Sequence, residues 1–184
     1  MNDLLAWPAQ LPSALCALAS EVAGALDRTA RILEDLSDAD ADAGAEAEPL
    51  LVILTGGDLA DMQVFSILDR IISARTGATA LVIGDGWIGT EGPDVASALV
   101  GAAAVALARS IAVRRHPTGR VNVVCVPEGL IGGAGSQRGP LAVKIGSSDV
   151  ADVVAFVLGD ASRYIDGQVL YADGGRQLFS SLTA

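Results

Sequence analysis

Short, continuous runs of apolar residues, separated by stretches with helical spacing, most strongly limit how this chain folds. Three such runs are residues 50–54, 79–83 and 120–126, and a last strand is predicted at 168–172. The segments between them carry apolar residues three and four positions apart, as helices do: 59–75, 94–115 and 148–159. Strands that are apolar on both faces and alternate with helices indicate a parallel sheet covered on both sides. The sequence therefore predicts an α/β fold with a doubly wound parallel sheet.

The first 49 residues have a different character. Residues 12–36 place leucines and a valine at spacings of three, four and seven, which predicts one amphipathic helix. Residues 37–49 are rich in Asp, Ala and Glu without periodicity, which is typical of a solvated acidic linker. We therefore expect an N-terminal helix plus linker over 1–49 and one α/β domain over 50–184.

Charge and hydropathy exclude several classes of partner. The net charge of −10 argues against nucleic acid and anionic membranes, because both select basic patches. The longest nearly apolar run, residues 98–108, ends at Arg109 and is shorter than the roughly 20 residues of a membrane span. The first residues lack the basic region of a signal peptide. We therefore expect a cytoplasmic protein without a membrane partner.

Three small groups of residues are candidates for chemical sites. Cys16, Cys125 and His116 lack the close spacing of metal ligands, so no metal site is expected. Residues 84–89 fit G-x-G-x-x-G, but four residues separate them from the next predicted helix, which favours a crossover loop. A hydrolytic triad of Asp85, Ser97 and His116 is disfavoured, because Ser97 does not lie on a strand-to-helix elbow.

Two segments of the second half resemble the short-chain dehydrogenase/reductase family. Residues 98–127, ALVGAAAVALARSIAVRRHPTGRVNVVCVP, are similar to that family's long helix and the "RVN…P" strand after it. Residues 148–175, SDVADVVAFVLGDASRYIDGQVLYADGG, are similar to its C-terminal helix, "DAS" turn, "I-x-GQ" lead-in and strand ending in "DGG". The resemblance covers about residues 50–180 and implies a Rossmann-like sheet.

The resemblance also implies where a cofactor would bind. Members of the family hold the dinucleotide on an N-terminal strand, a Gly-rich turn and a helix. Residues 1–49 contain only Gly24 and Gly44 and match nothing in the family. We therefore expect an incomplete sheet, with the first βα units replaced by the N-terminal helix, and no NAD(P) bound by this chain.

The family's catalytic pair, Tyr-x-x-x-Lys, is missing from the sequence. The only lysine is Lys144, and both tyrosines, Tyr164 and Tyr171, follow it. The family's tyrosine passes a proton to the substrate oxygen, and its lysine lowers the pKa of that tyrosine. The chain is therefore not expected to transfer hydride alone.

Three residues stand at the positions where the family carries its catalytic groups. Matching residues 107–112 to the family helix puts Ser97 at the tyrosine position and Gly101 at the lysine position. The family's serine position falls near Gly84 or Asp85. A serine hydroxyl is far less acidic than a phenol and glycine carries no charge, so these positions are expected to be degenerate.

The leading hypothesis is a non-catalytic subunit of a heteromeric short-chain dehydrogenase/reductase. A complete paralogue would bind NAD(P) and act on a carbonyl or alcohol substrate, as a ketoreductase does. Residues 98–108 are apolar nearly all round, so one face of that helix is expected to meet the paralogue. The predicted interface residues are Phe65, Leu68, Ile72, Gly101, Ala104, Ala108 and Tyr171.

Two alternatives remain open. One is a homo-oligomeric pseudoenzyme that binds a small ligand. The other is an enzyme with altered chemistry near Asp85 and Ser97.

Overall fold

In the computed structural model, six parallel strands form one sheet in the order β2-β1-β3-β4-β5-β6. The structure describes residues 3–7, 20–21, 29–32, 49–54, 63–87, 95–131 and 144–180. The strands are β1 (Asp3–Trp7), β2 (Thr29–Ile32), β3 (Leu50–Ile53), β4 (Ala78–Gly84), β5 (Arg120–Val126) and β6 (Val169–Tyr171). All neighbouring pairs are parallel, with Leu51 opposite Ala80 and Ala80 opposite Asn122.

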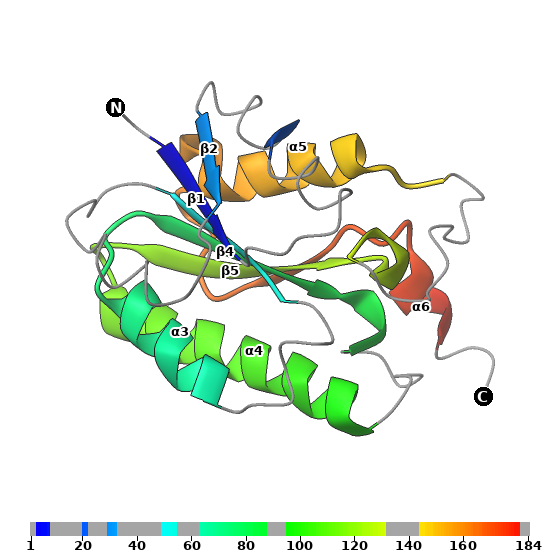
Figure 1. Cartoon of the computed structure of the whole chain (residues 1–184), viewed down its shortest axis with the longest axis horizontal. Coiled ribbons are helices and arrows are strands. Elements are labelled where there is room, and N and C mark those ends of the chain that lie inside the picture. The colour runs from blue at the N-terminus through cyan, green and yellow to red at the C-terminus, as the bar shows by residue number, and fades with distance from the viewer. Residues whose placement is uncertain are drawn as a thin grey trace.

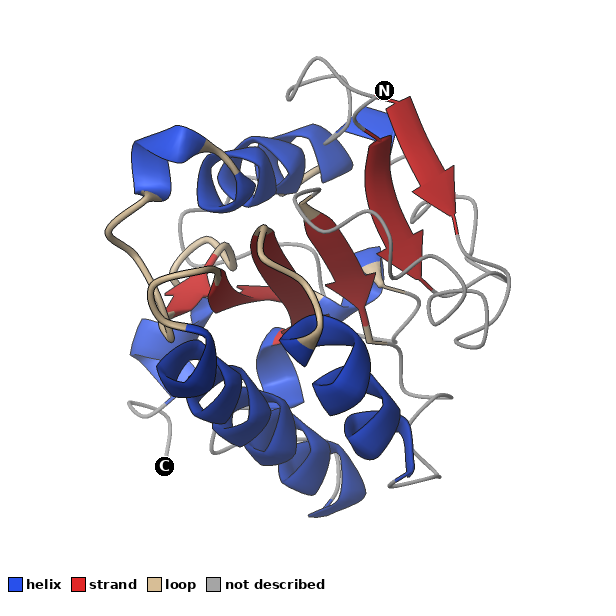
Figure 2. Ribbon diagram, turned by 90° about the vertical axis from the view of Figure 1, so that its left-hand side faces the viewer, coloured by secondary structure: helices blue, strands red, loops and turns tan. Residues whose placement is uncertain are grey.

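Helices cover both faces of the sheet (Figures 1 and 2). Helices α3 (Gln63–Ser73) and α4 (Val95–Arg115) lie side by side on one face, and α5 (Ser147–Leu158) lies on the other. The strands β3, β4 and β5 between these layers are almost wholly buried. Their continuous apolar sequence is therefore explained by burial on both sides, and the predicted α/β class is confirmed.

The predicted helix over residues 12–36 and the predicted loss of the first βα units are corrected by the structure. Ser20 and Glu21 are helical, but β2 runs through residues 29–32, inside the predicted helix. Strand β1, at residues 3–7, pairs with both β2 and β3, so the N-terminal strands belong to the same sheet as the rest. The leucines that suggested a helix lie on either side of β2 in the sequence, and the pairing of its four residues with β1 decides their conformation.

The position of β1 marks where a ligand site would be expected in such a sheet. From β1 the chain moves outward to β2 and then returns to β3 on the other side of β1. This reversal of direction is the topological switch point, where open α/β sheets bind ligands beyond the carboxyl ends of their strands.

Helix α4 is relevant to the prediction that the chain has no membrane span, because it is long and apolar. Among the described residues, Ser97–Arg115 alone is long and apolar enough for a span, a test that core helices also pass. One side of this helix is packed on the sheet, with Ala104 and Ile111 inaccessible to solvent. This packing accounts for the apolar residues on that side of the helix.

Candidate functional site at the carboxyl edge of the sheet

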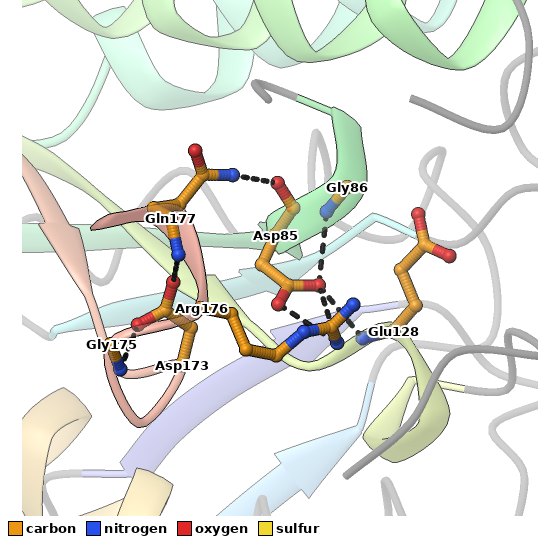
Figure 3. A network of polar contacts seen from close by, with 7 residues as sticks. All are labelled: Asp85, Gly86, Glu128, Asp173, Gly175, Arg176 and Gln177. Carbon is orange, nitrogen blue, oxygen red and sulfur yellow. Dashed lines mark hydrogen bonds and ion pairs between the residues drawn. The ribbon is translucent and has the colours of Figure 1, made fainter. Parts of the chain in front are cut away.

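Asp85 lies at the carboxyl end of β4, in the 3₁₀ turn η2 (Asp85–Trp87). Its side chain is only 2% exposed. The carboxylate accepts hydrogen bonds from the backbone N–H groups of Gly86 at 2.9 Å and Glu128 at 3.3 Å (Figure 3). Its Oδ2 lies 3.0 Å from Nη1 of Arg176 in an ion pair. Three segments distant in sequence therefore meet on one carboxylate.

The segment 173–177 closes over this carboxylate from the end of β6. Asp173 accepts hydrogen bonds at 2.8 Å from the backbone N–H groups of Gly175 and Gln177. Gly175 has a φ of 83°, a left-handed conformation that glycine adopts without strain, and it begins the turn into α6 (Arg176–Ser180). The side-chain amide of Gln177 then donates to the backbone carbonyl of Asp85 at 2.7 Å (Figure 3).

Burial dominates the electrostatics of this edge. It raises the pKa of Asp85 above its ordinary value, while Arg176 and the two backbone N–H groups counteract the rise. Burial also raises the pKa of the Cys125 thiol on β5, and the carboxylates of Asp85 and Asp173 add to that rise. A buried thiol of this kind stays protonated at neutral pH and is a poor nucleophile.

The sequence matches no protein-family model and no curated protein. Solved structures do match its fold. An oxidoreductase of the short-chain dehydrogenase/reductase family from Burkholderia thailandensis superimposes with a TM-score of 0.74 at 19% identity, covering 99% of this chain and 95% of that one. The 3-alpha-hydroxysteroid dehydrogenase from Pseudomonas sp. B-0831, complexed with NADH, gives 0.69 at 17% identity and covers 100% of both chains.

A 7 alpha-hydroxysteroid dehydrogenase, complexed with NADH and 7-oxo glycochenodeoxycholic acid, gives a TM-score of 0.71 at 15% identity, covering 94% and 93% of the two chains. The chain has a short-chain dehydrogenase/reductase-like fold. At these identities the likeness concerns the fold alone.

Within this dehydrogenase-like fold, the three family-matched positions lie on η2 and on α4. Asp85 bonds to Gly86, Glu128, Arg176 and Gln177, and the helix α4 that carries Ser97 contacts the η2 turn that carries Asp85. Ser97 lies half-buried in the first turn of α4, and Gly101 is buried one turn later.

His116 lies far from both of the other predicted triad members. It follows the C-terminal end of α4, whose 21 residues span about 30 Å. Asp85 and Ser97 lie at the other end of that helix. The arrangement excludes the Asp85–Ser97–His116 triad that the sequence already disfavoured. The G-x-G-x-x-G match at residues 84–89 does not lead directly into a helix. Gly84 ends β4, Asp85–Trp87 form η2, and α4 begins only at Val95.

The predicted interface residues need correction, because most of them face the core. Phe65, Leu68, Ile72, Gly101, Ala104 and Ala108 are buried within this chain. Most of them pack α3 and α4 onto the sheet and are not available to a partner, whereas Phe65 also lines a groove between the two helices. Tyr171, on the edge strand β6, is 45% exposed and remains accessible. Sequence periodicity does not reveal which side of α4 is buried, because its apolar residues occur all round the helix.

The sequence analysis did not identify Arg176, Glu128 and Asp173 as residues of the candidate site around Asp85. Arg176 directly follows the "DGG" motif, and its neighbour Asp85 is remote in sequence. The only available signal was that both residues follow predicted strands, whose carboxyl ends meet at one edge of a parallel sheet.

Proposed function

We propose that this chain is a non-catalytic subunit of a heteromeric, cytoplasmic short-chain dehydrogenase/reductase. It would assemble with a complete paralogue that binds NAD(P) and acts on a carbonyl or alcohol substrate. The observation that carries the proposal is the closed state of Asp85, one of the two residues near the family's serine position. Its carboxylate is 2% exposed and ion-paired with Arg176, so it is not presented to a substrate.

The connection after β1 supports the same proposal. β1 ends at Trp7 beside the switch point, where the family's Gly-rich turn would hold the pyrophosphate. Residues 8–19 contain two prolines and no glycine. Close approach of the backbone to a pyrophosphate depends on glycines at such a turn, and a proline offers no N–H donor. This sequence is poorly suited to hold the cofactor.

Two measurements test the proposal. Calorimetric titration of the isolated chain with NADH and with NADPH should show no binding. Co-expression with complete paralogues of its host should yield a complex with dehydrogenase activity. Within that complex, replacing the paralogue's catalytic tyrosine should abolish turnover, whereas Asp85→Asn in this chain should leave kcat nearly unchanged.

Three outcomes would contradict the proposal. A micromolar dissociation constant for either cofactor would show that the chain binds it directly. Failure to associate with any paralogue of the host would remove the heteromeric role. Turnover by the isolated chain that is lost in Ser97→Ala would instead support altered chemistry near Asp85 and Ser97.

A further inference from the structure

A groove lies at the amino edge of the sheet, at the end opposite the edge that holds Asp85. It measures about 480 Å³ and is lined by residues from 109–116, at the end of α4, and by residues 166–168, which lead into β6. We refer to it as the α4–β6 groove. Its volume is within the range of small-molecule sites in proteins, so the chemistry of its walls indicates what it could hold.

One wall of the α4–β6 groove carries the donors. Arg109 lies on α4, and His116 lies seven residues later, where its backbone N–H still donates to Ala112 at 3.1 Å. Seven residues are about two helical turns, so both side chains lie on the same side of the helix and line the groove. Both are exposed, and neither side chain makes a hydrogen bond or an ion pair with another described residue.

The facing wall carries the acceptors. Asp166 is half-buried, and its Oδ1 accepts a hydrogen bond from the backbone N–H of Val121 at 2.8 Å. This bond orients the carboxylate, whose Oδ2 has no partner within the described part of the chain. The amide nitrogen of Gln168 donates to the backbone carbonyl of Asp166 at 2.9 Å. The amide oxygen of Gln168 is thereby left as a second acceptor beside the carboxylate.

Arg109 and Asp166 line the same groove, yet among the described contacts no ion pair joins them. Gly167 lies between the two walls with a φ of 66°, a conformation that favours glycine. A Cβ at this position would lie 3.5 Å from Cβ of Ala112 and 3.9 Å from Cγ of Arg109, so a side chain would occupy the space between the walls. Two opposite charges that share a groove without meeting are complementary to a ligand that carries both charges.

We propose that the α4–β6 groove binds a free amino acid with an apolar side chain, as a zwitterion. The ligand's carboxylate accepts hydrogen bonds from the side chains of Arg109 and His116. Its ammonium group donates to Oδ2 of Asp166 and to the amide oxygen of Gln168. Hydrogen bonds between charged groups are the strong ones, and here each charge of the ligand meets its opposite.

The rest of the groove suits an apolar side chain. Val113 is 80% exposed and lies beside the buried Ala112, so a ligand that covers Val113 removes apolar surface from water. A doubly charged anion such as phosphate fits less well, because the carboxylate of Asp166 would repel it. This inference does not depend on the proposed function, which concerns the opposite edge of the sheet and a paralogue.

Calorimetric titration of the full chain with L-leucine tests the inference. Two probes with the same apolar body isolate the two charges: isocaproate lacks the ammonium group, and isoamylamine lacks the carboxylate. Leucine should bind, and each probe should bind about tenfold more weakly or worse, because it loses the hydrogen bonds of one charged group.

Two variants assign the charges to the walls. Arg109→Gln should weaken leucine binding about tenfold or more and leave the binding of isoamylamine unchanged. Asp166→Asn should weaken leucine binding similarly and leave isocaproate unchanged, while the asparagine carbonyl can still accept from Val121. The matched control is Arg114→Gln, which removes the same charge from the other side of α4 and should bind leucine as the wild type does.

Three results would overturn the inference. Isocaproate that binds as tightly as leucine would show a site for simple anions. Leucine, valine and methionine that all fail to bind at millimolar concentrations would show that the groove holds no apolar amino acid. Leucine binding that survives both Arg109→Gln and Asp166→Asn would place the amino acid elsewhere on the chain. None of these results bears on whether the chain binds NAD(P) or a paralogue, so the two proposals fail separately.

Discussion

The side-chain carbonyl of Asn122, in the middle of β5, accepts a hydrogen bond from the backbone N–H of Gln168 at 3.0 Å. The amide of the same side chain donates to the carbonyl of Ile165 at 2.9 Å. Between these two contacts, Gly167 adopts a φ of 66° and donates its N–H to Val121 at 2.8 Å. The "RVN" and "I-x-GQ" sequence motifs are therefore one hydrogen-bonded unit, which holds the start of β6 against β5.

Asn122→Leu should destabilise the chain, because it removes both hydrogen bonds that the buried Asn122 side chain makes to the 165–168 loop. Each such hydrogen bond contributes about 0.5–1.5 kcal/mol, so we expect a loss of about 1–3 kcal/mol. Urea unfolding followed by circular dichroism measures it. Gln168→Ala is the matched control, since Gln168 contributes its backbone N–H to Asn122 and should lose much less. Equal losses in the two variants would argue against this role of Asn122.

The ionisation of Asp85 should make stability depend on pH. Burial raises its folded pKa above the ordinary 3.8, so its protonation favours the folded state. That contribution is complete below pH 3.8 and is lost as the pH rises through the folded pKa. The free energy of unfolding of the wild type, minus that of Asp85→Asn, should therefore decrease as the pH rises from about 4 to about 7.

Arg176→Met should enlarge this decrease, because the guanidinium is the largest influence that opposes the raised pKa. Urea unfolding at several pH values gives the comparison. Arg163→Met, at an exposed arginine, controls for the loss of one positive charge and should follow the wild type. A difference between wild type and Asp85→Asn that stays constant with pH would show that Asp85 titrates normally.

Gly119→Ala should destabilise the turn between α4 and β5. A Cβ at this position would collide with the guanidinium of Arg115, which is 4% exposed. That guanidinium donates to the carbonyl of Gly77 at 2.6 Å and to the hydroxyl of Thr79 at 3.3 Å, and burial lowers its pKa to about 10. Displacing it should cost about 1–3 kcal/mol of stability in urea unfolding.

A double-mutant comparison isolates the cause of that loss. In an Arg115→Ala background the guanidinium is absent, so Gly119→Ala should then have a much smaller effect. Additive losses in the two variants would point to the backbone of Gly119 and away from the collision.

The central part of the fold was predictable because burial on both sides leaves a clear pattern. Strands β3, β4 and β5 are continuous apolar runs, and the predicted strands match them to within a residue or two. The N-terminal strands were missed because β2 has only four residues and pairing decides its conformation. Local spacing carries no information about such a pairing.

The candidate site was predictable only in part, because its contacts join distant segments. The resemblance drew attention to Asp85, but nothing near it in the sequence indicates a cation. The choice of interface residues failed for a related reason. Helix α4 is apolar on every side, and only its packing on the sheet shows that Ala104 is inside and Ala102 outside.

The ion pair at the carboxyl edge also sets an order of events during synthesis of the chain. The ribosome delivers Asp85 well before Arg176, which lies 91 positions later. A growing chain that has completed β4 and β5 therefore holds a carboxylate that it cannot bury in charged form without large cost. We expect this edge to stay open on ribosome-bound chains that stop before residue 173, and to close only when the last helix has emerged.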